Sequence, residues 1–335
     1  MPVPYLHQRF PALRERLPHI QLGTGPTPLT PLGDWASDGG GSAVWLKDEG
    51  PFGDGDWGGN KVRKLEWLIP DAQRRGRRTI LSFGGLGTNW GYAVTRYAAE
   101  HGIGTALALV DQPVDDHVRA QLGRLRESGA TLHFTRTKAR TIACAPWLLA
   151  RHSSRGRLPY VLPAGGSSAV GALGYVETAL ELAAQVRDGV MPEPSHLVTA
   201  VGSGGTAAGL LLGLRMAGLR TRVVAVVVND TLRLDAVALV RLARRTEKLL
   251  RQRGADLPDQ HLTVDDLDVT TDWLGPGYGH ATPEATAAQA LAAAHDGPPL
   301  DPVYTGKATA ALLATNAFGR FGDGPVVLLQ TNGPR

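Results

Sequence analysis

The sequence predicts an α/β protein with two domains, each a mostly parallel, twisted sheet flanked by helices. Short apolar segments alternate with amphipathic segments along most of the 335 residues, which is typical of repeated strand–helix units. Glycine clusters follow several of the apolar segments, as loops between strands and helices require. A length of 335 residues suggests two domains at about 100–200 residues each, and a hydrophobic content of 43% supplies ample core.

The first half of the chain begins with a Pro- and Gly-rich stretch, residues 1–42, which we expect to form an extended arm and loops. Strands are predicted at 43–49, 79–83, 104–110, 131–134 and 160–162. Helices are predicted at 61–75, 90–101, 115–129 and 141–151. Pro70 should bend or break the first of these helices, because proline lacks the N–H that the helix needs.

The second half continues the alternation. Helices are predicted at 174–185, 206–217, 230–253, 283–294 and 307–318. Strands are predicted at 196–201, 222–228, 262–269 and 325–329. The segment RVVAVVV at 222–228 is almost continuously apolar, as parallel strands buried on both faces are.

Composition argues against several classes of protein. Cys144 is the one cysteine, so we expect neither an internal disulfide nor a multi-cysteine zinc site, and we interpret it as a small buried apolar residue. Asp54 and Asp56 lack the ligand spacing of a calcium loop, so no metal is expected. The net charge is +4 without a basic stripe, so nucleic acid is not an expected partner.

The N-terminal twenty residues have no apolar core of the kind that secretory signals carry. No run approaches the roughly 20 apolar residues of a membrane span. We therefore expect a soluble cytoplasmic protein with no membrane partner.

Lys61 stands in the stretch GGNKVRKLE, residues 58–66. Asn60 is a good N-cap residue, which would place Lys61 in the first turn of a helix behind a loop of little bulk. The positive end of the helix dipole disfavours a protonated ammonium there, and a neutral lysine can form a Schiff base with an aldehyde. A surface lysine beside a flexible loop is the alternative for this stretch alone.

The second chemical signal is the loop GSGGT, residues 202–206, between an apolar strand and a helix. Its free backbone N–H groups and the helix dipole suit an anion, and Ser203 and Thr206 add hydroxyl donors. The loop is neither the dinucleotide fingerprint nor the Walker pattern, so a phosphate monoester fits best, although an ordinary tight turn is the alternative. An imine-forming lysine with a phosphate site is what pyridoxal 5′-phosphate needs.

The chain resembles the fold-type II pyridoxal-phosphate enzymes, the tryptophan synthase β superfamily. Within them it looks most like the branch that contains 1-aminocyclopropane-1-carboxylate (ACC) deaminase and D-cysteine desulfhydrase, nearer the latter. The matching motifs occur in family order over nearly the whole chain: GGNKVRKLE, GGLGTN at 84–89, PAGGSSAVGALGY at 163–175, GSGGTAAG at 202–209, GYG at 277–279 and DPVYTGKA at 301–308. We expect residues 1–52 and 164–335 to form a large cofactor-binding domain and 53–163 a small one.

The resemblance implies roles for individual residues. Lys61 would bind the cofactor as a Schiff base and carry the main proton, and Asn89 would hydrogen-bond the cofactor's ring hydroxyl. Thr88 stands where the family usually has serine, and its hydroxyl would contact the substrate carboxylate or assist proton removal. The phosphate would lie on the loop formed by Gly202, Ser203, Gly204, Gly205 and Thr206.

Two tyrosines, Tyr278 and Tyr304, match those that line the family's active site. By themselves they would be interpreted as a loop aromatic anchored to the surface and as a core tyrosine. Trp90 stands where a smaller or imidazole side chain is common, which bears on substrate size. Asn332 replaces a common glycine near the predicted pyridine end of the cofactor.

Thr305 follows the tyrosine of DPVY, where ACC deaminases are expected to carry glutamate beside the pyridine nitrogen. A threonine cannot keep that nitrogen protonated, so a hydroxyl of Thr331 or Thr305 would bond a neutral nitrogen. The weaker electron sink suffices for α-proton removal and loss of a good β-leaving group. This favours β-elimination over opening of a cyclopropane ring.

The predicted function is therefore a pyridoxal-phosphate lyase or deaminase. It would act by α,β-elimination on a small amino acid resembling D-cysteine and release a 2-oxo acid, ammonia and the leaving group. The alternatives are ACC deamination, β-replacement or another reaction on a bulkier amino acid, and a cofactor-binding protein without catalysis. The family implies a homodimer.

Overall fold

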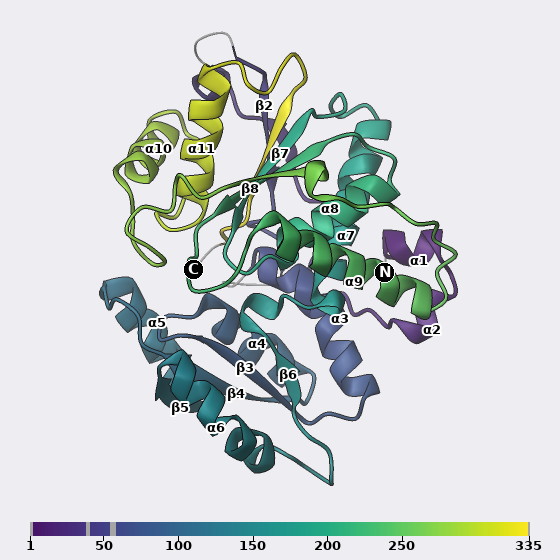
Figure 1. Ribbon diagram of the computed structural model, residues 1–335, viewed down its shortest axis with the longest axis vertical. Coiled ribbons are helices and arrows are strands. Elements are labelled where there is room, and N and C mark those ends of the chain that lie inside the picture. Colours follow the sequence, from purple (N-terminus) through teal and green to yellow (C-terminus); the bar gives the residue numbers. More distant parts are fainter. Residues whose placement is uncertain (1–2, 38–40, 54–57, 334–335) are drawn as a thin grey trace.

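The computed structural model describes residues 3–37, 41–53 and 58–333, and its strands within those ranges form two open sheets (Figure 1). The six-stranded sheet has the order β1-β2-β10-β7-β8-β9, and the four-stranded sheet has the order β5-β4-β3-β6. Neighbouring strands in the described ranges are parallel, except that β1 is antiparallel to β2. Helices flank both sheets, so the predicted fold class is confirmed.

The strands are β1 Leu29–Pro31, β2 Val44–Asp48, β3 Thr79–Gly85, β4 Gly104–Val110, β5 Thr131–Arg136, β6 Tyr160–Leu162, β7 His196–Val201, β8 Arg222–Val227, β9 Leu267–Thr270 and β10 Val326–Gln330. The α-helices are α1 Tyr5–Arg9, α2 Leu13–Arg16, α3 Asn60–Arg74, α4 Asn89–Glu100, α5 Asp116–Glu127, α6 Lys138–Arg151, α7 Ala169–Arg187, α8 Gly205–Met216, α9 Ala236–Gln252, α10 Pro283–Ala294 and α11 Thr305–Ala317. Short 3₁₀ turns are η1 Asp34–Ala36, η2 Ala164–Gly166 and η3 Val264–Asp266.

The larger sheet is buried on both faces, which explains its nearly continuous apolar strands. On β10, Val327 and Leu329 pack into the main core, whereas Val326 and Leu328 face a second cluster that includes Leu312 of α11. The smaller sheet is likewise covered on both faces, but the apolar cluster on its second face is small. Its strand β3 places Ile80 in the main core and Leu81 in a small cluster beneath α6.

Helix α3 runs through Pro70 without a break, so of the two expected effects of this proline, a bend or a break, the break does not occur. The reason is a contact from the N-terminal arm. Pro70 cannot donate to the carbonyl of Glu66, and the backbone N–H of Ile20 donates to that oxygen instead, at 3.0 Å. The arm therefore replaces the hydrogen bond that the proline removes.

The N-terminal arm is more regular than the prediction of an extended arm and loops. The carboxylate of Glu177 accepts hydrogen bonds from the backbone N–H groups of Tyr5 and Leu6, which fixes the start of α1. Leu6 and Leu13 are fully buried, so both short helices dock through apolar side chains. Tertiary contacts thus form helices where the local sequence gives little periodicity.

Three predicted boundaries shift by several residues because of capping groups. The long helix predicted from residue 230 begins at Ala236, after the N-cap Asp235. The helix predicted from residue 174 begins at Ala169, after the N-cap Ser168. The strand predicted from residue 262 begins at Leu267, because η3 precedes it.

The strands of the smaller sheet all lie between residues 79 and 162, and those of the larger sheet lie before 49 or after 195. Helix α3 packs extensively against α7 of the larger unit. Domain boundaries at 52/53 and 163/164 remain a prediction. Among the described residues, no helix has both the length and the apolar character needed to cross a bilayer.

Candidate active site

Most of the predicted site residues lie where strands β3, β7 and β10 end and where helices α3, α4 and α8 begin, whereas Tyr304 and Thr305 lie at the start of α11 and Tyr278 lies in the loop before α10. In parallel sheets these carboxyl ends are where ligands bind. Gly59, just before α3, has φ of +95°, and a Cβ there would lie 2.9 Å from the carbonyl oxygen of Thr331. Only glycine allows this approach, so the first turn of α3 sits directly against the end of β10.

Lys61 is half-buried in that first turn, and its Nζ donates to Oδ1 of Asn60 at 2.9 Å. Asn60 is the first residue of the helix rather than its cap, which corrects the sequence prediction. Gly59 occupies the N-cap position without a side-chain hydrogen bond. The amide of Asn60 is thereby available to hold the ammonium of Lys61.

Ser167, Ser203 and Gly205 form a hydrogen-bonded cluster at the start of α8, which we call the anion cradle because the predicted phosphate loop contains two of its residues. Ser167 Oγ donates to Ser203 Oγ at 2.8 Å and accepts from the backbone N–H of Gly205 at 2.9 Å. A Cβ on Gly165 would lie 2.2 Å from Ser203 Oγ, so glycine is required where the two loops meet. Ser167 was not predicted as a site residue, although the PAGGSS motif contains it.

Lys64 is a second lysine that sequence reasoning missed. It is buried, one helical turn beyond Lys61, and its Nζ donates to the neutral carbonyl of Gly165 at 3.2 Å. Burial, with a smaller contribution from the charge of Lys61, lowers the pKa of Lys64 to about 7. An anion beside Gly165 would favour its protonated form, and the spacing of the two lysines in GGNKVRKLE was the available signal.

A buried ion network anchors α3 beneath Lys61. The guanidinium of Arg63 contacts Glu49 at 2.8 Å and Glu181 at 2.9 Å, and Lys47 also pairs with Glu181. Burial raises the pKa of Glu181, but Arg63 and Lys47 outweigh it and lower the value to about 2. The helix that carries Lys61 is therefore tied to β2 and α7 by charged groups.

Thr88 and Asn89 begin α4. Thr88 is the N-cap, and its Oγ1 accepts from the backbone N–H of Gly91 at 3.0 Å. Oδ1 of Asn89 is buried and has no hydrogen-bond partner among the described residues. Such an atom is costly unless a ligand group donates to it. A ring hydroxyl would supply that donor.

Tyr278 and Tyr304 meet, with their hydroxyl oxygens 2.6 Å apart and their rings edge to face. Tyr304 also adjoins the glycine-rich loop, since a Cβ on Gly202 would lie 2.8 Å from its Cε1. Burial raises the pKa of Tyr278, and the hydrogen bond with Tyr304 opposes this in part. The two predicted tyrosines thus form one pair beside the predicted phosphate loop.

The two threonines proposed for the pyridine nitrogen differ in their surroundings. The hydroxyl of Thr305 donates to Oδ2 of Asp301 at 2.9 Å and accepts from the backbone N–H of Asp301 at 2.8 Å. Thr331 is buried at the end of β10, beside the start of α3. This geometry favours Thr331 for a contact with the ring.

Trp90 has a packing role. It is only 4% exposed, and its indole N–H donates to Oγ of Ser82 at 2.8 Å. Its ring lies against Gly166, where a Cβ would be 2.5 Å from Cη2. Trp90 therefore supports the loop that contains Ser167.

Other residues singled out from the sequence make no contact with the groups above that the structure shows, or are not described. Cys144 is half-buried and packs against the small cluster under α6. Asp54 and Asp56 lie outside the described residues. Asn332 donates to the carbonyl of Pro299 at 3.4 Å. Residues of the described ranges include no group of three or more His, Cys, Asp or Glu placed to hold a metal ion.

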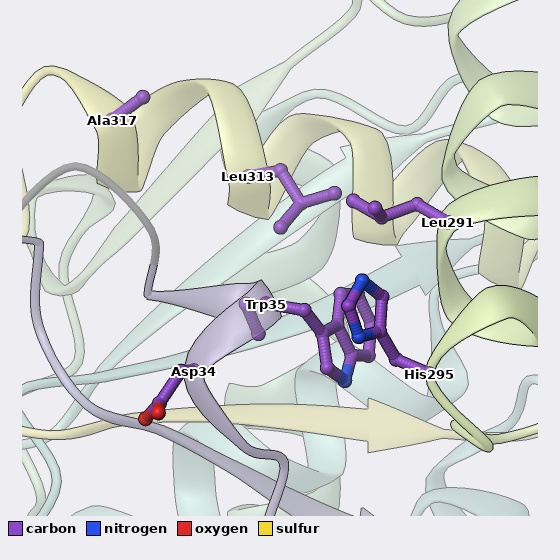
Figure 2. Close-up of a pocket in the computed structure, with 7 residues that line it drawn as sticks. Asp34, Trp35, Leu291, His295, Leu313 and Ala317 are labelled. Atoms are coloured by element: carbon purple, nitrogen blue, oxygen red, sulfur yellow. The ribbon is translucent and has the colours of Figure 1, made fainter.

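A separate cavity of about 450 Å³ lies between η1, α10 and α11. Figure 2 shows the rings of Trp35 and His295 stacked in it, with Leu291 and Leu313 beside them. None of the predicted site residues lines it.

The donor set fits pyridoxal 5′-phosphate: it offers a lysine that can form an imine, a buried acceptor without a partner, and hydroxyl and N–H groups at a helix N-terminus. An enzyme of that cofactor class needs these groups. The chain belongs to the pyridoxal-phosphate dependent enzyme family, whose sequence pattern matches residues 20–332. The predicted cofactor and enzyme class are confirmed by this match.

Among individual relatives, the D-cysteine desulfhydrase of Klebsiella pneumoniae is 34% identical over 326 residues, covering 95% of this chain and 94% of that protein. The D-cysteine desulfhydrase of Salmonella paratyphi A is 34% identical over 327 residues, with the same coverage. The crystal structure of an ACC deaminase homologue superposes with a TM-score of 0.80 at 26% identity, covering 99% of this chain and 95% of that one. The resemblance predicted from the motifs is confirmed.

Proposed function

We propose that the protein catalyses α,β-elimination of D-cysteine or a close analogue, with pyridoxal 5′-phosphate as cofactor. The reaction would consume D-cysteine and water and give pyruvate, ammonia and hydrogen sulfide. The observation that carries the proposal is that a chain 34% identical to a D-cysteine desulfhydrase places Lys61, the unpartnered oxygen of Asn89 and the anion cradle at the N-terminal ends of α3, α4 and α8.

Each group has a place in holding the cofactor. Lys61 Nζ would bond its aldehyde carbon, Asn89 Oδ1 would accept from its ring hydroxyl, and Thr331 would donate to its ring nitrogen. The phosphate would occupy the anion cradle and the N-terminus of α8. When bound, pyridoxal phosphate supplies a conjugated ring that stabilises negative charge at the substrate α-carbon.

The side chains then move protons. The Nζ of Lys61, once released, takes the proton from Cα. The electron pair of that C–H bond forms the Cα–Cβ double bond, and the Cβ–S bond breaks with its pair on sulfur. A hydroxyl of the Tyr278–Tyr304 pair donates the proton that sulfur needs. Water hydrolyses the released enamine to the 2-oxo acid and ammonia.

Thr88 supports orientation in this scheme. Its hydroxyl and the free N–H groups at the start of α4 suit the substrate carboxylate, because a helix N-terminus favours negative charge. The hydroxyl keeps one donor for this purpose, since its contact with Gly91 uses it as an acceptor.

Absorbance and turnover together test the proposal. Wild type, Lys61→Ala and the exposed-lysine control Lys248→Ala are loaded with pyridoxal phosphate and given D-cysteine, L-cysteine or ACC, with coupled detection of the 2-oxo acid. Wild type and Lys248→Ala should show the visible band of bound cofactor and release pyruvate from D-cysteine. In Lys61→Ala the visible band should shift away from its wild-type position. The rate of pyruvate release should fall at least about 1,000-fold. A wild type that leaves D-cysteine unchanged refutes the proposed substrate.

ACC deamination is the second candidate, favoured by the structural likeness to an ACC deaminase homologue. Thr305 argues against it, because the resemblance places glutamate there in ACC deaminases. Release of 2-oxobutyrate from ACC in the same assay would favour this candidate. Bound cofactor without turnover of any of the three amino acids would favour β-replacement or another reaction on a bulkier amino acid, or a protein without catalysis.

We also propose a cytoplasmic homodimer, as the family resemblance implies. Size-exclusion chromatography with light scattering should give the holoenzyme twice the mass of one chain. Cell fractionation should recover the protein with cytoplasmic markers. A monomer mass would refute the dimer.

A further inference from the structure

We propose that Asp230 and Lys307 are positioning residues for Tyr278: they fix the loop of residues 274–278 so that its tyrosine meets Tyr304. The role of Tyr278 in the reaction rests on the proposed function, whereas the fixing of the loop stands on contacts in the fold. Neither residue was singled out by the sequence, and neither belongs to the cofactor site described above.

Asp230 controls the backbone at Tyr278. It lies just beyond β8, and its Oδ1 accepts from the backbone N–H of Tyr278 at 3.1 Å. Gly277 has φ of +138°, a conformation that side chains rarely adopt, and a Cβ there would lie 3.2 Å from Oδ2 of Asp230. The glycine lets the loop turn closely over the carboxylate, which then orients the next residue.

Lys307 controls the other end of the loop. It lies in the first turn of α11, is fully buried, and donates from Nζ to the carbonyl of Leu274 at 2.8 Å. A buried ammonium is costly unless it is hydrogen-bonded and electrostatically compensated. Burial lowers the pKa of Lys307, and the negative charges of Asp230 and Asp301 oppose this. The hydrogen bond to Leu274 therefore ties the loop to α11.

These two contacts set the geometry of the tyrosine pair because Tyr304 immediately precedes α11. The end of β8 serves the cofactor side as well, since Nδ2 of Asn229 donates to the carbonyl of Gly202 at 2.8 Å. Adjacent residues thus fix the glycine-rich loop and the tyrosine loop. The hydroxyl pair is placed by groups outside the tyrosines themselves.

The test combines kinetics of the holoenzyme with hydrogen–deuterium exchange of peptides that cover residues 273–281. Asp230→Ala should lower kcat for D-cysteine by about 10- to 100-fold, because misplacement of a reacting group by about 1 Å has effects of that size. Exchange in the loop should rise about tenfold, and the cofactor's absorbance band should not change. Asp230→Asn should restore both values towards wild type, because its amide oxygen can still accept from Tyr278.

Asp272→Ala is the matched control. Asp272 is exposed in the segment that leads to the same loop, and its backbone N–H rather than its carboxylate makes the local hydrogen bond, to Thr270. This variant should behave as wild type in both measurements. Lys307→Met, which keeps the aliphatic stem, should raise exchange at the Leu274 end. Because Asp230 is exposed, its variants should fold normally. They therefore test the positioning of the loop even if Lys307→Met folds poorly.

Unchanged exchange in Asp230→Ala overturns the inference, whatever happens to kcat. Faster exchange with unchanged kcat overturns the positioning role of Asp230. If wild type does not act on D-cysteine but Asp230→Ala still loosens the loop, the proposed function fails and the fixing of the loop is supported.

Discussion

The hydroxyl oxygens of Tyr278 and Tyr304 lie 2.6 Å apart, although 26 residues separate the two tyrosines in the chain. At this distance one hydroxyl donates a hydrogen bond to the other. Burial raises the pKa of Tyr278 above its ordinary value of 10.0, so Tyr278 retains its proton at neutral pH. The tyrosine pair therefore supplies a proton donor beside the glycine-rich loop.

Removing either hydroxyl should impair the same step. Tyr278→Phe and Tyr304→Phe should each lower kcat for D-cysteine by about 100-fold, the usual scale for loss of a general acid. The double variant should be no more than about tenfold worse than the worse single variant, because the two hydroxyls act as a unit. Steady-state kinetics of the three holoenzymes would measure this. Fully multiplicative effects would show that the tyrosines act independently.

Tyr160→Phe is the control for loss of a tyrosine hydroxyl. Its hydroxyl donates to Asp71 at 2.6 Å, away from the site. This variant should lose about 1–3 kcal/mol of unfolding free energy, because a buried carboxylate loses a donor, and should keep its kcat. If Tyr160→Phe lowered kcat as much as Tyr278→Phe and Tyr304→Phe do, the effect of those two variants could not be assigned to the tyrosine pair.

Lys64 should make stability depend on pH in the cofactor-free protein. Its pKa is about 7 in the folded chain against an ordinary value of 10.5, so between these values the unfolded chain binds more protons. Stability should therefore rise with pH in this window, by up to about 1.4 kcal/mol per unit. Urea unfolding at pH 7, 8 and 9 should show a steeper rise for wild type than for Lys64→Met. Parallel pH profiles would contradict a lowered pKa.

Trp90 should affect stability more than substrate preference. Trp90→Phe removes the hydrogen bond to Ser82 and part of the ring that supports Gly166. The unfolding free energy should fall by about 1–3 kcal/mol, while the ratio of rates with D- and L-cysteine should stay within about twofold. Urea unfolding and paired kinetics measure the two quantities. A large change in that ratio with normal stability would instead place Trp90 in contact with substrate.

Glu181 should be essential to the ion network under α3. Glu181→Gln leaves Arg63 and Lys47 buried with less negative charge, which should cost about 3–5 kcal/mol of unfolding free energy at pH 7. The exposed pair of Arg119 and Asp116 is the comparison, and Arg119→Ala should cost less than about 0.5 kcal/mol. Equal losses in urea unfolding would mean that burial does not strengthen the network.

The Glu181 contribution also has a direction in pH. Its pKa is lowered to about 2 in the folded protein from an ordinary 4.5, so the stabilisation is present above pH 4.5 and is lost as the pH falls towards 2. The difference between wild type and Glu181→Gln should therefore shrink over that acidic range. A constant difference would contradict the shift.

Local patterns were sufficient for most of the fold. The strands at 104–110, 160–162 and 196–201 have the predicted bounds, because compact apolar runs end at polar residues, proline or glycine. Helix α1 was missed because its first N–H groups are bonded by Glu177, about 170 residues away. Helix α3 passes through Pro70 because Ile20 supplies the missing donor. Neither contact leaves a trace in the surrounding sequence.

The candidate site could be proposed from the sequence only where its motifs are local. Lys61, Asn89 and the 202–206 loop each stand in a short glycine-rich motif, and the resemblance linked them. Ser167 and Lys64 were missed because their partners, Ser203 and Gly165, lie 36 and 101 residues away. The distinction between Thr305 and Thr331 likewise depends on Asp301, whose contact with Thr305 becomes visible only in three dimensions.

The last strand of the chain, β10, lies in the middle of the larger sheet, between β2 and β7. The larger sheet can therefore close only after β10 has been synthesised, whereas the four-stranded sheet, built from residues 79–162, can assemble earlier. The same strand leads to Thr331, against which the first turn of α3 rests. A polypeptide that stops short of β10 thus lacks both the strand that joins β2 to β7 and the backbone against which the helix of Lys61 rests.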